Sequence, residues 1–465
     1  MTTRATAPAG ASSGARQLAL NVLLQVQAGA YADVALHRTL TQGALGESDS
    51  RGERSAERAF ATELVYGTVR RQRTLDALID QLGTRPADKQ PPVLRLVLHL
   101  GLYQLRYLTA VPDSAAVNTS VDLAKANGLG KLSGVVNGLL RQYIRQAEQG
   151  PDPLKLPEQP ATALGIRHSY PDWLVALWLD QLGPEETDQL CQWFNRVPTI
   201  DLRVNRQQTT VEAVKTAFEA AGIAVEPLPG LPFGLRLVNH QGSLPDLPGY
   251  DAGWWSVQDA SAQLVGLLLD PQPGETVLDV CAAPGGKATQ MAEIVGEAGK
   301  VWACDRAPSR LKKITANASR LGITNLHTHA GDSTDLAQFH GQADRVLVDA
   351  PCSGLGTLHR HADARWRQSP ESIVALAELQ SALLAEAARC VKPGGSLVYA
   401  TCTLHPAENE AVIEAFCHAQ SQWRVQPPAH GFGHGLDVTP QGWVRVWPHR
   451  QNMDGFFMAK LQASQ

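Results

Sequence analysis

Two cysteines stand where they can act as reagents, because each follows a short apolar run typical of a buried strand. Residues 346–348 precede an Asp-Ala-Pro-Cys sequence that ends at Cys352, and residues 397–400 precede a Thr-Cys pair that ends at Cys402. The carboxyl ends of parallel strands meet at one edge of a sheet, where α/β proteins place their chemistry. We therefore expect both thiols at the active edge.

A thiolate at this edge suits chemistry on a pyrimidine ring. Carbon C5 of a pyrimidine is a poor nucleophile, but sulfur addition at C6 makes C5 enamine-like and able to attack a methyl sulfonium. An unperturbed thiol is only roughly 3% ionised at neutral pH, so it needs activation, through the pyrimidine or by Lys287. Release of the product needs a second acid or base, which Cys352 or Asp349 can supply. Spacing alone does not decide which cysteine attacks.

The stretch 276–288 predicts a buried parallel strand, a glycine turn and a helix that begins near Lys287. A phosphate-binding GxxxxGK loop followed by Ser or Thr would need Gly at Cys281 and a hydroxyl at Ala288. The dinucleotide pattern GxGxxG is also absent. S-adenosylmethionine remains, because it carries no phosphate and needs a tight turn beside its methionine part.

Carboxylates follow the next two apolar segments. Asp305 ends the run 301–304 and can accept the two ribose hydroxyls of S-adenosylmethionine at the carboxyl edge of the sheet. Asp332 follows the next segment and is placed to meet the adenine. The series of acids after a strand, a glycine turn and a helix supports the assignment of this cofactor.

The spacing of apolar residues predicts the fold class. Residues 15–145 have helical periodicity throughout, whereas strands and helices alternate after residue 199. Repeated βαβ units imply a doubly wound, mostly parallel sheet. The expected domains are a disordered tail (1–14), an all-helical domain (15–147), a Pro-rich linker (148–162), a small α/β module (163–250) and a doubly wound α/β domain (251–465).

Composition limits the possible partners. A net charge of -4 with 18% charged residues gives no strongly basic field over the whole chain, so any nucleic-acid contact must be a local patch. Seven cysteines without a CxxC pair argue against disulfides and a zinc cluster, and no apolar run is long enough to span a membrane. We expect a cytoplasmic monomer without a metal.

Two sets of side chains are candidates for RNA contact, with an ordinary solvated surface as the alternative in both cases. One set is basic and lies in the helical domain: Arg70, Arg71, Arg73, Lys131, Arg141 and Arg145. The other set follows Cys352 and offers phosphate contacts and base stacking: Arg360, Arg365, Trp366 and Arg367. Glu408 and Glu410, after Cys402, are interpreted as acids at the start of a helix.

Several of these segments resemble the NOL1/NOP2/Sun family of RNA cytosine-5 methyltransferases, namely 279–287, 349–354, the Thr-Cys pair at Cys402 and the closing 454–460. The helical domain, with the sequence 64–70, looks like the antitermination-factor NusB-like domain that precedes the catalytic domain in the bacterial ribosomal branch of that family. The resemblance covers nearly the whole chain and implies a Rossmann-like methyltransferase domain.

The resemblance assigns roles that spacing leaves open. It makes Cys402 the nucleophile and Cys352 the residue that assists product release, and it lets Asp349 contact the edge of the base. Lys287 and Asp349 remain the candidates for activation and for the second acid or base, and Thr403 replaces a serine common in the family. It also places S-adenosylmethionine on a set of residues that includes the glycine turn and the acids: Cys281, Ala282, Ala283, Pro284, Gly285, Gly286, Lys287, Asp305, Asp332 and Asp349.

The implied activity is methylation of C5 of a cytidine in small-subunit (16S) ribosomal RNA. The same chemistry on transfer RNA is an alternative, because the motifs around the two cysteines do not separate the substrates. A non-catalytic RNA-binding assembly factor is an alternative of another class, and the presence of both cysteines and all three acids argues against it.

Overall fold

The computed structural model describes residues 13–41, 51–238, 242–429, 432–433, 435–463. Almost all of the expected N-terminal tail lies outside these ranges. The chain forms two compact units, Met1–Asn195 with His361–Arg367, and Arg196–Arg360 with Gln368–Gln465. Across the described residues, no helix is both long and apolar enough to cross a membrane.

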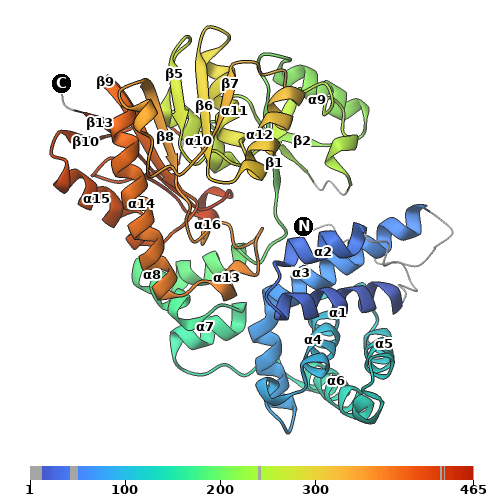
Figure 1. Cartoon of the computed structure of the whole chain (residues 1–465). Coiled ribbons are helices and arrows are strands. Elements are labelled where there is room, and N and C mark those ends of the chain that lie inside the picture. The colour runs from blue at the N-terminus through green and yellow to red at the C-terminus, as the bar shows by residue number, and fades with distance from the viewer. Residues whose placement is uncertain (1–12, 42–50, 239–241, 430–431, 434, 464–465) are drawn as a thin grey trace. The chain divides into compact units, whose positions relative to one another are not determined.

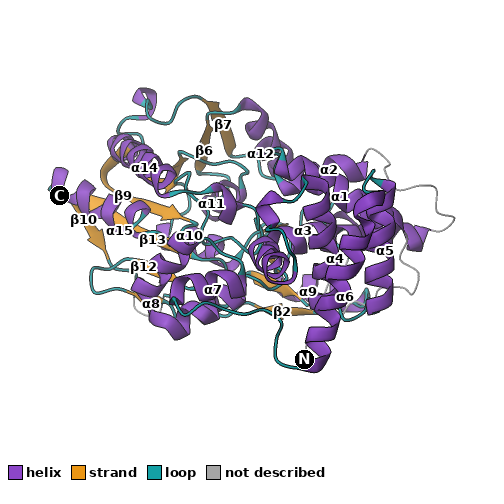
Figure 2. Ribbon diagram, turned by 90° about the horizontal axis from the view of Figure 1, so that it is seen from below, coloured by secondary structure: helices purple, strands orange, loops and turns teal. Residues whose placement is uncertain are grey.

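The first unit consists of helices, with no strand among its described residues (Figures 1 and 2). Apolar side chains at helical spacing form one core, to which α4 contributes Leu94, Val97 and Leu98. No helix is assigned between residues 150 and 159, in the Pro-rich stretch. The helices are α1 Ser13–Gln27, α2 Ala32–Thr41, α3 Arg51–Leu82, α4 Pro92–Tyr107, α5 Asp113–Ala126, α6 Ser133–Gln149, α7 Pro160–His168, α8 Asp172–Trp193 and α13 Ala364–Arg367.

The second unit begins with a four-stranded antiparallel sheet in the order β2-β3-β1-β4. Helix α9 (Val211–Ala220) packs on it through Val214 and Phe218. The expected module 163–250 also includes α8 and most of α7, whose contacts group them with the first unit. The strands are β1 Ile200–Val204, β2 Val225–Pro227, β3 Gly234–Leu237 and β4 Trp255–Val257.

The large sheet has the order β11-β12-β13-β9-β8-β5-β6-β7, with β10 paired to β13. Strands β9, β8, β5, β6 and β7 run parallel to one another, whereas β10 to β13 add antiparallel pairs at one side. The strands are β5 Thr276–Asp279, β6 Lys300–Asp305, β7 Leu326–Ala330, β8 Ala343–Asp349, β9 Val391–Thr401, β10 Trp423–Gln426, β11 Asp437–Val438, β12 Val444–Val446 and β13 Phe456–Ala463.

Alternate side chains of each strand point to opposite faces of this sheet, so its apolar strands present two apolar faces. Helices cover both of them. Helices α10 (Ala260–Leu269), α11 (Gly286–Val295) and α12 (Pro308–Arg320) share one core with Val277 and Leu347. Helices α14 (Pro370–Cys390) and α15 (Glu410–Ala419) share the other with Leu278 and Val346. The predicted order of a helical region, a small α/β module and a doubly wound sheet is confirmed.

The packing of α3 against α4 gives a stability prediction for the first unit. A Cβ added at Gly67 would lie 2.0 Å from Cζ of Tyr103, a buried ring whose hydroxyl is held by Glu63. Gly67→Ala should therefore lower the free energy of unfolding by about 1–3 kcal/mol through overpacking. Urea unfolding followed by circular dichroism measures the change.

The matched control is Gly138→Ala in α6, where the added Cβ meets nothing within 4 Å. This substitution should leave the protein as stable or raise its stability by up to about 1 kcal/mol, because alanine favours a helix over glycine. Equal stability of the two variants would contradict the close contact between Gly67 and Tyr103.

Candidate active site

The two cysteines singled out by the sequence lie together. Strands β8 and β9 are neighbours in register, with Asp349 opposite Ala400, and each cysteine follows the end of its strand. The Sγ atoms of Cys352 and Cys402 are 3.4 Å apart, and both residues are partly exposed. The register of β8 and β9 thus brings both thiols to the carboxyl edge of the sheet, where the sequence analysis expected them.

The environment of Cys352 disfavours its thiolate. The hydrogen bond with Cys402, and then burial, raise the pKa of Cys352 well above its ordinary value. Either sulfur can be the donor in this hydrogen bond, so the contact alone does not assign the nucleophile. A thiol with a raised pKa is the poorer nucleophile, which agrees with Cys402 as the attacking sulfur.

Lys287 supplies a fixed positive charge beside the thiols. Burial acts against its charged form, but the Asp349 carboxylate, 2.7 Å from Nζ, outweighs burial and raises the pKa of Lys287. The charge of Cys402 raises this pKa further. A lysine that stays protonated cannot remove a proton from Cys402, but its ammonium can stabilise the thiolate.

The glycine turn has the expected form. Strand β5 ends at Asp279, the peptide between Ala283 and Pro284 is cis, and α11 begins at Gly286. Gly285 has φ +105°, and a Cβ there would lie 3.1 Å from the Ile314 side chain, so a side chain at this position would be strained. Gly285 therefore keeps the turn before α11 free of a side chain at this position.

The two acids after the turn reach the same edge of the sheet but differ in their surroundings. Asp305 ends β6 and is buried, and its carboxylate accepts from Ala307 N at 2.9 Å and pairs with Arg310 at 3.0 Å. Asp332 is exposed, and hydrogen bonds from Thr334 lower the pKa of its carboxyl group. Arg310 must move for a ribose to use the paired oxygen of Asp305, and its half-exposed side chain allows this.

Asp279 is a candidate that sequence reasoning did not select, although it opens the 279–287 segment. Its side chain is 0% exposed, and neither carboxyl oxygen accepts a well-formed hydrogen bond among the described residues, although the Cys281 backbone N–H lies close enough to lower the pKa of this carboxyl. Burial, and then the neighbouring Asp349, raise the pKa of Asp279 to about 8. The Asp279 carboxyl therefore keeps hydrogen-bonding capacity beside the glycine turn, where S-adenosylmethionine is expected to bind.

The raised pKa of Asp279 predicts a pH dependence of stability. The ordinary pKa of an aspartate is about 3.9, so the folded chain binds a proton that the unfolded chain lacks between about pH 4 and pH 8. The stability associated with the neutral carboxyl is present below pH 4 and is lost as pH rises toward 8. Asp279→Asn cannot ionise, so it should lose less stability between pH 5 and pH 8, by on the order of a few kcal/mol.

Thermal unfolding of both proteins without cofactor at the two pH values measures this difference. All other titrating groups are shared, so subtracting one pH profile from the other isolates Asp279. Identical profiles would show that Asp279 is already ionised at pH 5.

Glu408 lies in a one-turn 3-10 helix, Pro406–Glu408, and Glu410 is the first residue of α15, so both acids stand at helix starts as interpreted. The Glu408 carboxylate also has a role that the sequence did not indicate. Glu408 is 0% exposed and accepts from Ser353 N at 2.9 Å and from Thr403 Oγ1 at 3.1 Å. Gln380 of α14 donates to it at 3.0 Å. Ser353 and Thr403 directly follow the two cysteines, so one buried carboxylate joins the loops that carry both thiols. Local sequence patterns do not indicate this role, because Ser353 and Gln380 lie far from Glu408 along the chain.

The arginines expected to contact RNA have structural partners instead. Arg365 is 0% exposed, lies over the Tyr170 ring at 4.1 Å, and donates to Ser169 O at 3.2 Å. Trp366 Nε1 donates to Val69 O at 3.0 Å, and Arg367 pairs with Asp363. These three side chains hold the segment His361–Arg367 within the first unit. Arg365 is therefore not available for a phosphate contact, whereas Trp366 and Arg367 are partly exposed.

The basic set of the helical region contains some residues that are buried or paired and others that are exposed. Arg70 is buried, and burial lowers its pKa, while Arg73 pairs with Asp172 at 2.7 Å. Arg71 lies over the Tyr107 ring. Exposed basic residues of the predicted set are Lys131, Arg141 and Arg145. In the part of the chain that is described, no three His, Cys, Asp or Glu residues are grouped to hold a metal ion.

Comparison with protein families gives three matches along the chain. Residues 13–145 match the NusB family, and residues 170–242 match the ferredoxin-like domain described as RsmF/B-like. Residues 266–462 match the family described as 16S rRNA methyltransferase RsmB/F. The three matches follow one another in the order of the helical region, the antiparallel sheet and the large sheet.

Individual relatives match over nearly the whole chain. A probable ribosomal RNA small subunit methyltransferase B from Synechocystis is 49% identical, with 96% of this chain and 99% of the relative covered. A protein of the same description from Bacillus subtilis is 34% identical, with 96% and 98% covered. The crystal structure of PH0851 is 26% identical and has a TM-score of 0.79, with 97% of this chain and 99% of that chain covered.

Proposed function

The chain belongs to the RsmB/F family of S-adenosylmethionine-dependent methyltransferases, and we propose that it methylates C5 of a cytidine in 16S ribosomal RNA. The proposed reaction passes through a covalent bond between a cysteine and C6. The observation that carries this chemistry is the contact between the Cys352 and Cys402 sulfurs, 3.4 Å apart, beyond the ends of the paired strands β8 and β9. The names of the relatives support the ribosomal substrate.

The cofactor side of the site is proposed to be the glycine turn with the acids beside it. Backbone of 281–287 would hold the methionine part, Asp305 and Asp332 the ribose and adenine, and Asp349 the region next to the thiols. The buried carboxyl of Asp279 and the side-chain-free turn at Gly285 support this fit. S-adenosylmethionine, when bound, supplies an electrophilic methyl group on sulfur.

The first step is attack by Cys402. Its thiol proton passes to water or to the cytosine, and the Lys287 ammonium stabilises the thiolate. The Sγ electron pair forms a bond to C6, and the C5–C6 π electrons move to C5. With S-adenosylmethionine bound, these electrons would form the bond from C5 to its methyl group, and the electrons of the old methyl–sulfur bond would stay on the departing sulfur.

Product release needs the C5 proton to leave and the bond between sulfur and C6 to break. The electrons of the C5–H bond restore the C5–C6 double bond, and the Sγ–C6 electrons return to Cys402. Cys352, whose sulfur lies 3.4 Å from that of Cys402 and whose pKa is raised, supplies a proton to the leaving sulfur. The base that takes the C5 proton is the Cys352 sulfur or Asp349.

The proposed RNA partner also needs a binding surface. In the helical unit, Lys131, Arg141 and Arg145 are the exposed members of the predicted basic set, so they are the positions for phosphate contacts. The expected location of the protein is the cytoplasm, where its RNA is assembled into ribosomes.

The role of Cys402 predicts the effect of its removal. Cys402→Ala should abolish methyl transfer, because it removes the proposed attacking sulfur, and should leave the affinity for S-adenosylmethionine near that of the wild type. Transfer of labelled methyl and calorimetric titration of the cofactor measure the two properties. Cys417→Ala, at a partly exposed cysteine outside the site, is the control and should stay active. Transfer by Cys402→Ala would remove Cys402 from the nucleophile role.

The proposed role of Cys352 predicts that its removal lets the covalent protein–RNA intermediate accumulate, instead of preventing attack on the RNA. Cys352→Ala should form the bond to RNA but release it slowly, so a covalent protein–RNA band should build up on a denaturing gel during turnover. The band should disappear in Cys352→Ala/Cys402→Ala, because the attacking sulfur is absent. Turnover by Cys352→Ala at the wild-type rate without a band would contradict the release role.

The substrate is tested by nucleoside analysis of unmodified small-subunit RNA and bulk transfer RNA after incubation with labelled cofactor. We expect 5-methylcytidine from the ribosomal RNA alone. A product from transfer RNA alone would keep the mechanism and replace the substrate. Binding of RNA without transfer to either would favour the assembly-factor alternative.

A further inference from the structure

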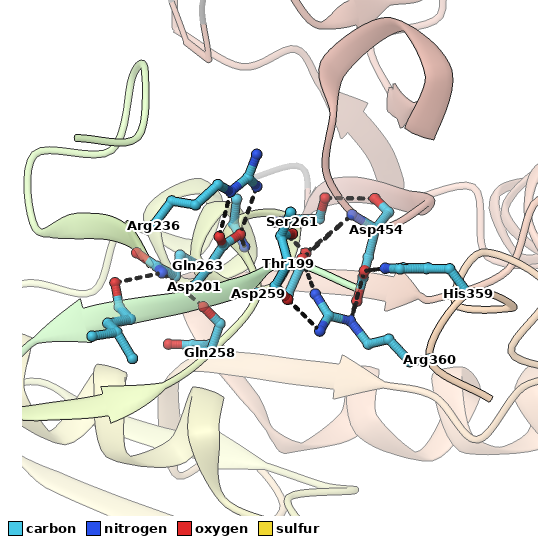
Figure 3. Close-up of polar contacts among 12 residues, drawn as sticks. Thr199, Asp201, Arg236, Gln258, Asp259, Ser261, Gln263, His359, Arg360 and Asp454 are labelled. Atoms are coloured by element: carbon cyan, nitrogen blue, oxygen red, sulfur yellow. Dashed lines mark hydrogen bonds and ion pairs between the residues drawn. The ribbon is translucent and has the colours of Figure 1, made fainter. Parts of the chain in front are cut away.

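A cluster of buried charges lies beside the cysteine loops and takes no part in the reaction described above. It contains Arg360, Asp259 and Asp454, which come from the end of the Cys352 loop, the start of α10 and the residue two before β13 (Figure 3). Both aspartates are buried, and the arginine is one quarter exposed. The three segments are far apart in the sequence.

Arg360 joins these segments through its whole guanidinium group. Its Nε donates to both carboxylate oxygens of Asp454, at 2.9 and 3.0 Å. One terminal nitrogen donates to Asp259 Oδ2 at 3.0 Å and the other to the Thr199 carbonyl at 2.8 Å. Figure 3 shows the guanidinium between the two acids. A lysine has a single nitrogen and cannot span these acceptors in the same geometry.

The main chain of Asp454 is held on both sides by the start of α10. Asp259 caps this helix by accepting from Ser261 N at 2.8 Å, and it also accepts from Asp454 N at 3.3 Å. The Ser261 hydroxyl donates to Asp454 O at 2.6 Å. His359 Nε2 lies 3.1 Å from Asp454 Oδ1. The position of Asp454 therefore follows the position of Arg360 and α10.

From Asp454 the connection continues to both catalytic loops. Gly455 N donates to Gly356 O at 2.8 Å, and Gly356 N donates to Cys402 O at 2.9 Å. A Cβ at Gly356 would lie 2.0 Å from Gly455 O. Gly356 is in the loop that carries Cys352, so the backbones of three segments meet without spare room. A shift at Asp454 must move the Cys352 loop, the Cys402 carbonyl or both.

The charges explain why the arginine is needed for this arrangement. Burial and the neighbouring Asp454 raise the pKa of Asp259 to about 7, burial also raises the pKa of Asp454, and Arg360 opposes the rise for both. Without Arg360, two buried carboxylates would face each other with no cation bonded between them. Such a pair relaxes by taking up a proton or by moving apart.

We propose that Arg360 is a positioning residue, which holds the Asp454–Gly455 backbone so that the Cys352 thiol stays against the Cys402 sulfur. It touches neither RNA nor cofactor in this role. The consequence for catalysis rests on the proposed function, whereas the effect on the distance between the thiols does not. An ion pair that only stabilises the fold is the alternative.

The distance between the thiols can be measured without RNA. Diamide accepts two electrons and two protons from a pair of neighbouring thiols, which become a disulfide, and the rate depends on how often the sulfurs meet. In the wild type, the peptide linked through Cys352 and Cys402 should form readily and be identified by mass spectrometry. Arg360→Lys should slow its formation by about tenfold, as expected for displaced reacting atoms.

The matched control is Arg345→Lys. Arg345 of β8 makes a comparable two-bond contact with Glu275, at 2.9 and 3.0 Å, and its side chain is 18% exposed. It lies toward the other end of its strand from the Cys352 loop. Arg345→Lys should cost similar stability but leave the rate of disulfide formation within about twofold of the wild type.

With ribosomal RNA as substrate, Arg360→Lys should lower kcat by about tenfold and leave KM for RNA nearly unchanged, because it affects the alignment of the thiols and not the binding surface. Asp454→Asn removes the carboxylate charge that is paired with Arg360 and should reproduce both effects. If Arg360→Lys does not fold, Asp454→Asn alone tests the proposal.

Wild-type rates of disulfide formation in a folded variant of either position would overturn the proposal. Slowed disulfide formation by Arg360→Lys and Arg345→Lys alike would also overturn it, because general destabilisation would then explain the result. If the wild type methylates no RNA while Arg360→Lys still slows the disulfide specifically, the positioning role stands and the proposed function fails.

Discussion

The contact between the Cys352 and Cys402 sulfurs is the constraint on which the rest of the site depends. Both cysteines lie beyond the ends of their strands, in loops, where a chain is ordinarily most mobile. The register of β8 and β9 brings the loops to the same edge, but it does not by itself hold two sulfurs 3.4 Å apart. Further contacts must fix the loops, and they come from residues that carry out no chemistry.

Two such contacts hold the loops from different sides. The Glu408 carboxylate bonds to the residues directly after each cysteine, Ser353 and Thr403. The close backbone contact of Gly356 with Cys402 and Gly455 continues to Arg360 through Asp454. A buried hydrogen bond and a glycine contact both tolerate little displacement, since one leaves an unsatisfied polar atom and the other a steric clash. Together they turn two loops into a rigid support.

Buried charge is a second common feature of this unit, and it is paired almost everywhere around the site. Lys287 is paired with Asp349, Arg203 with Glu293 at 2.6 Å, and Arg360 with two aspartates. Removal of one partner from a buried pair is strongly destabilising, which keeps such pairs in place once they form. Asp279 differs, because no cationic side chain is paired with its buried carboxyl among the described residues, and its pKa is raised to about 8. Groups with strongly shifted pKa values cluster at functional sites, which supports a ligand-binding role for Asp279.

The sequence by itself determined the elements and the reagents. Apolar periodicity of 2 and of 3.6 residues located the strands and helices of the large sheet, and the small residues 281–286 located the turn before α11, because these patterns are local. Only the tertiary structure decided the roles of Arg365, Glu408, Asp279 and Arg360. An arginine in a sequence is equally compatible with a phosphate contact and with a buried ion pair. Which one forms depends on partners that the chain brings from 100 or more residues away, such as Asp259 for Arg360 and Ser169 for Arg365, and no local pattern contains that information.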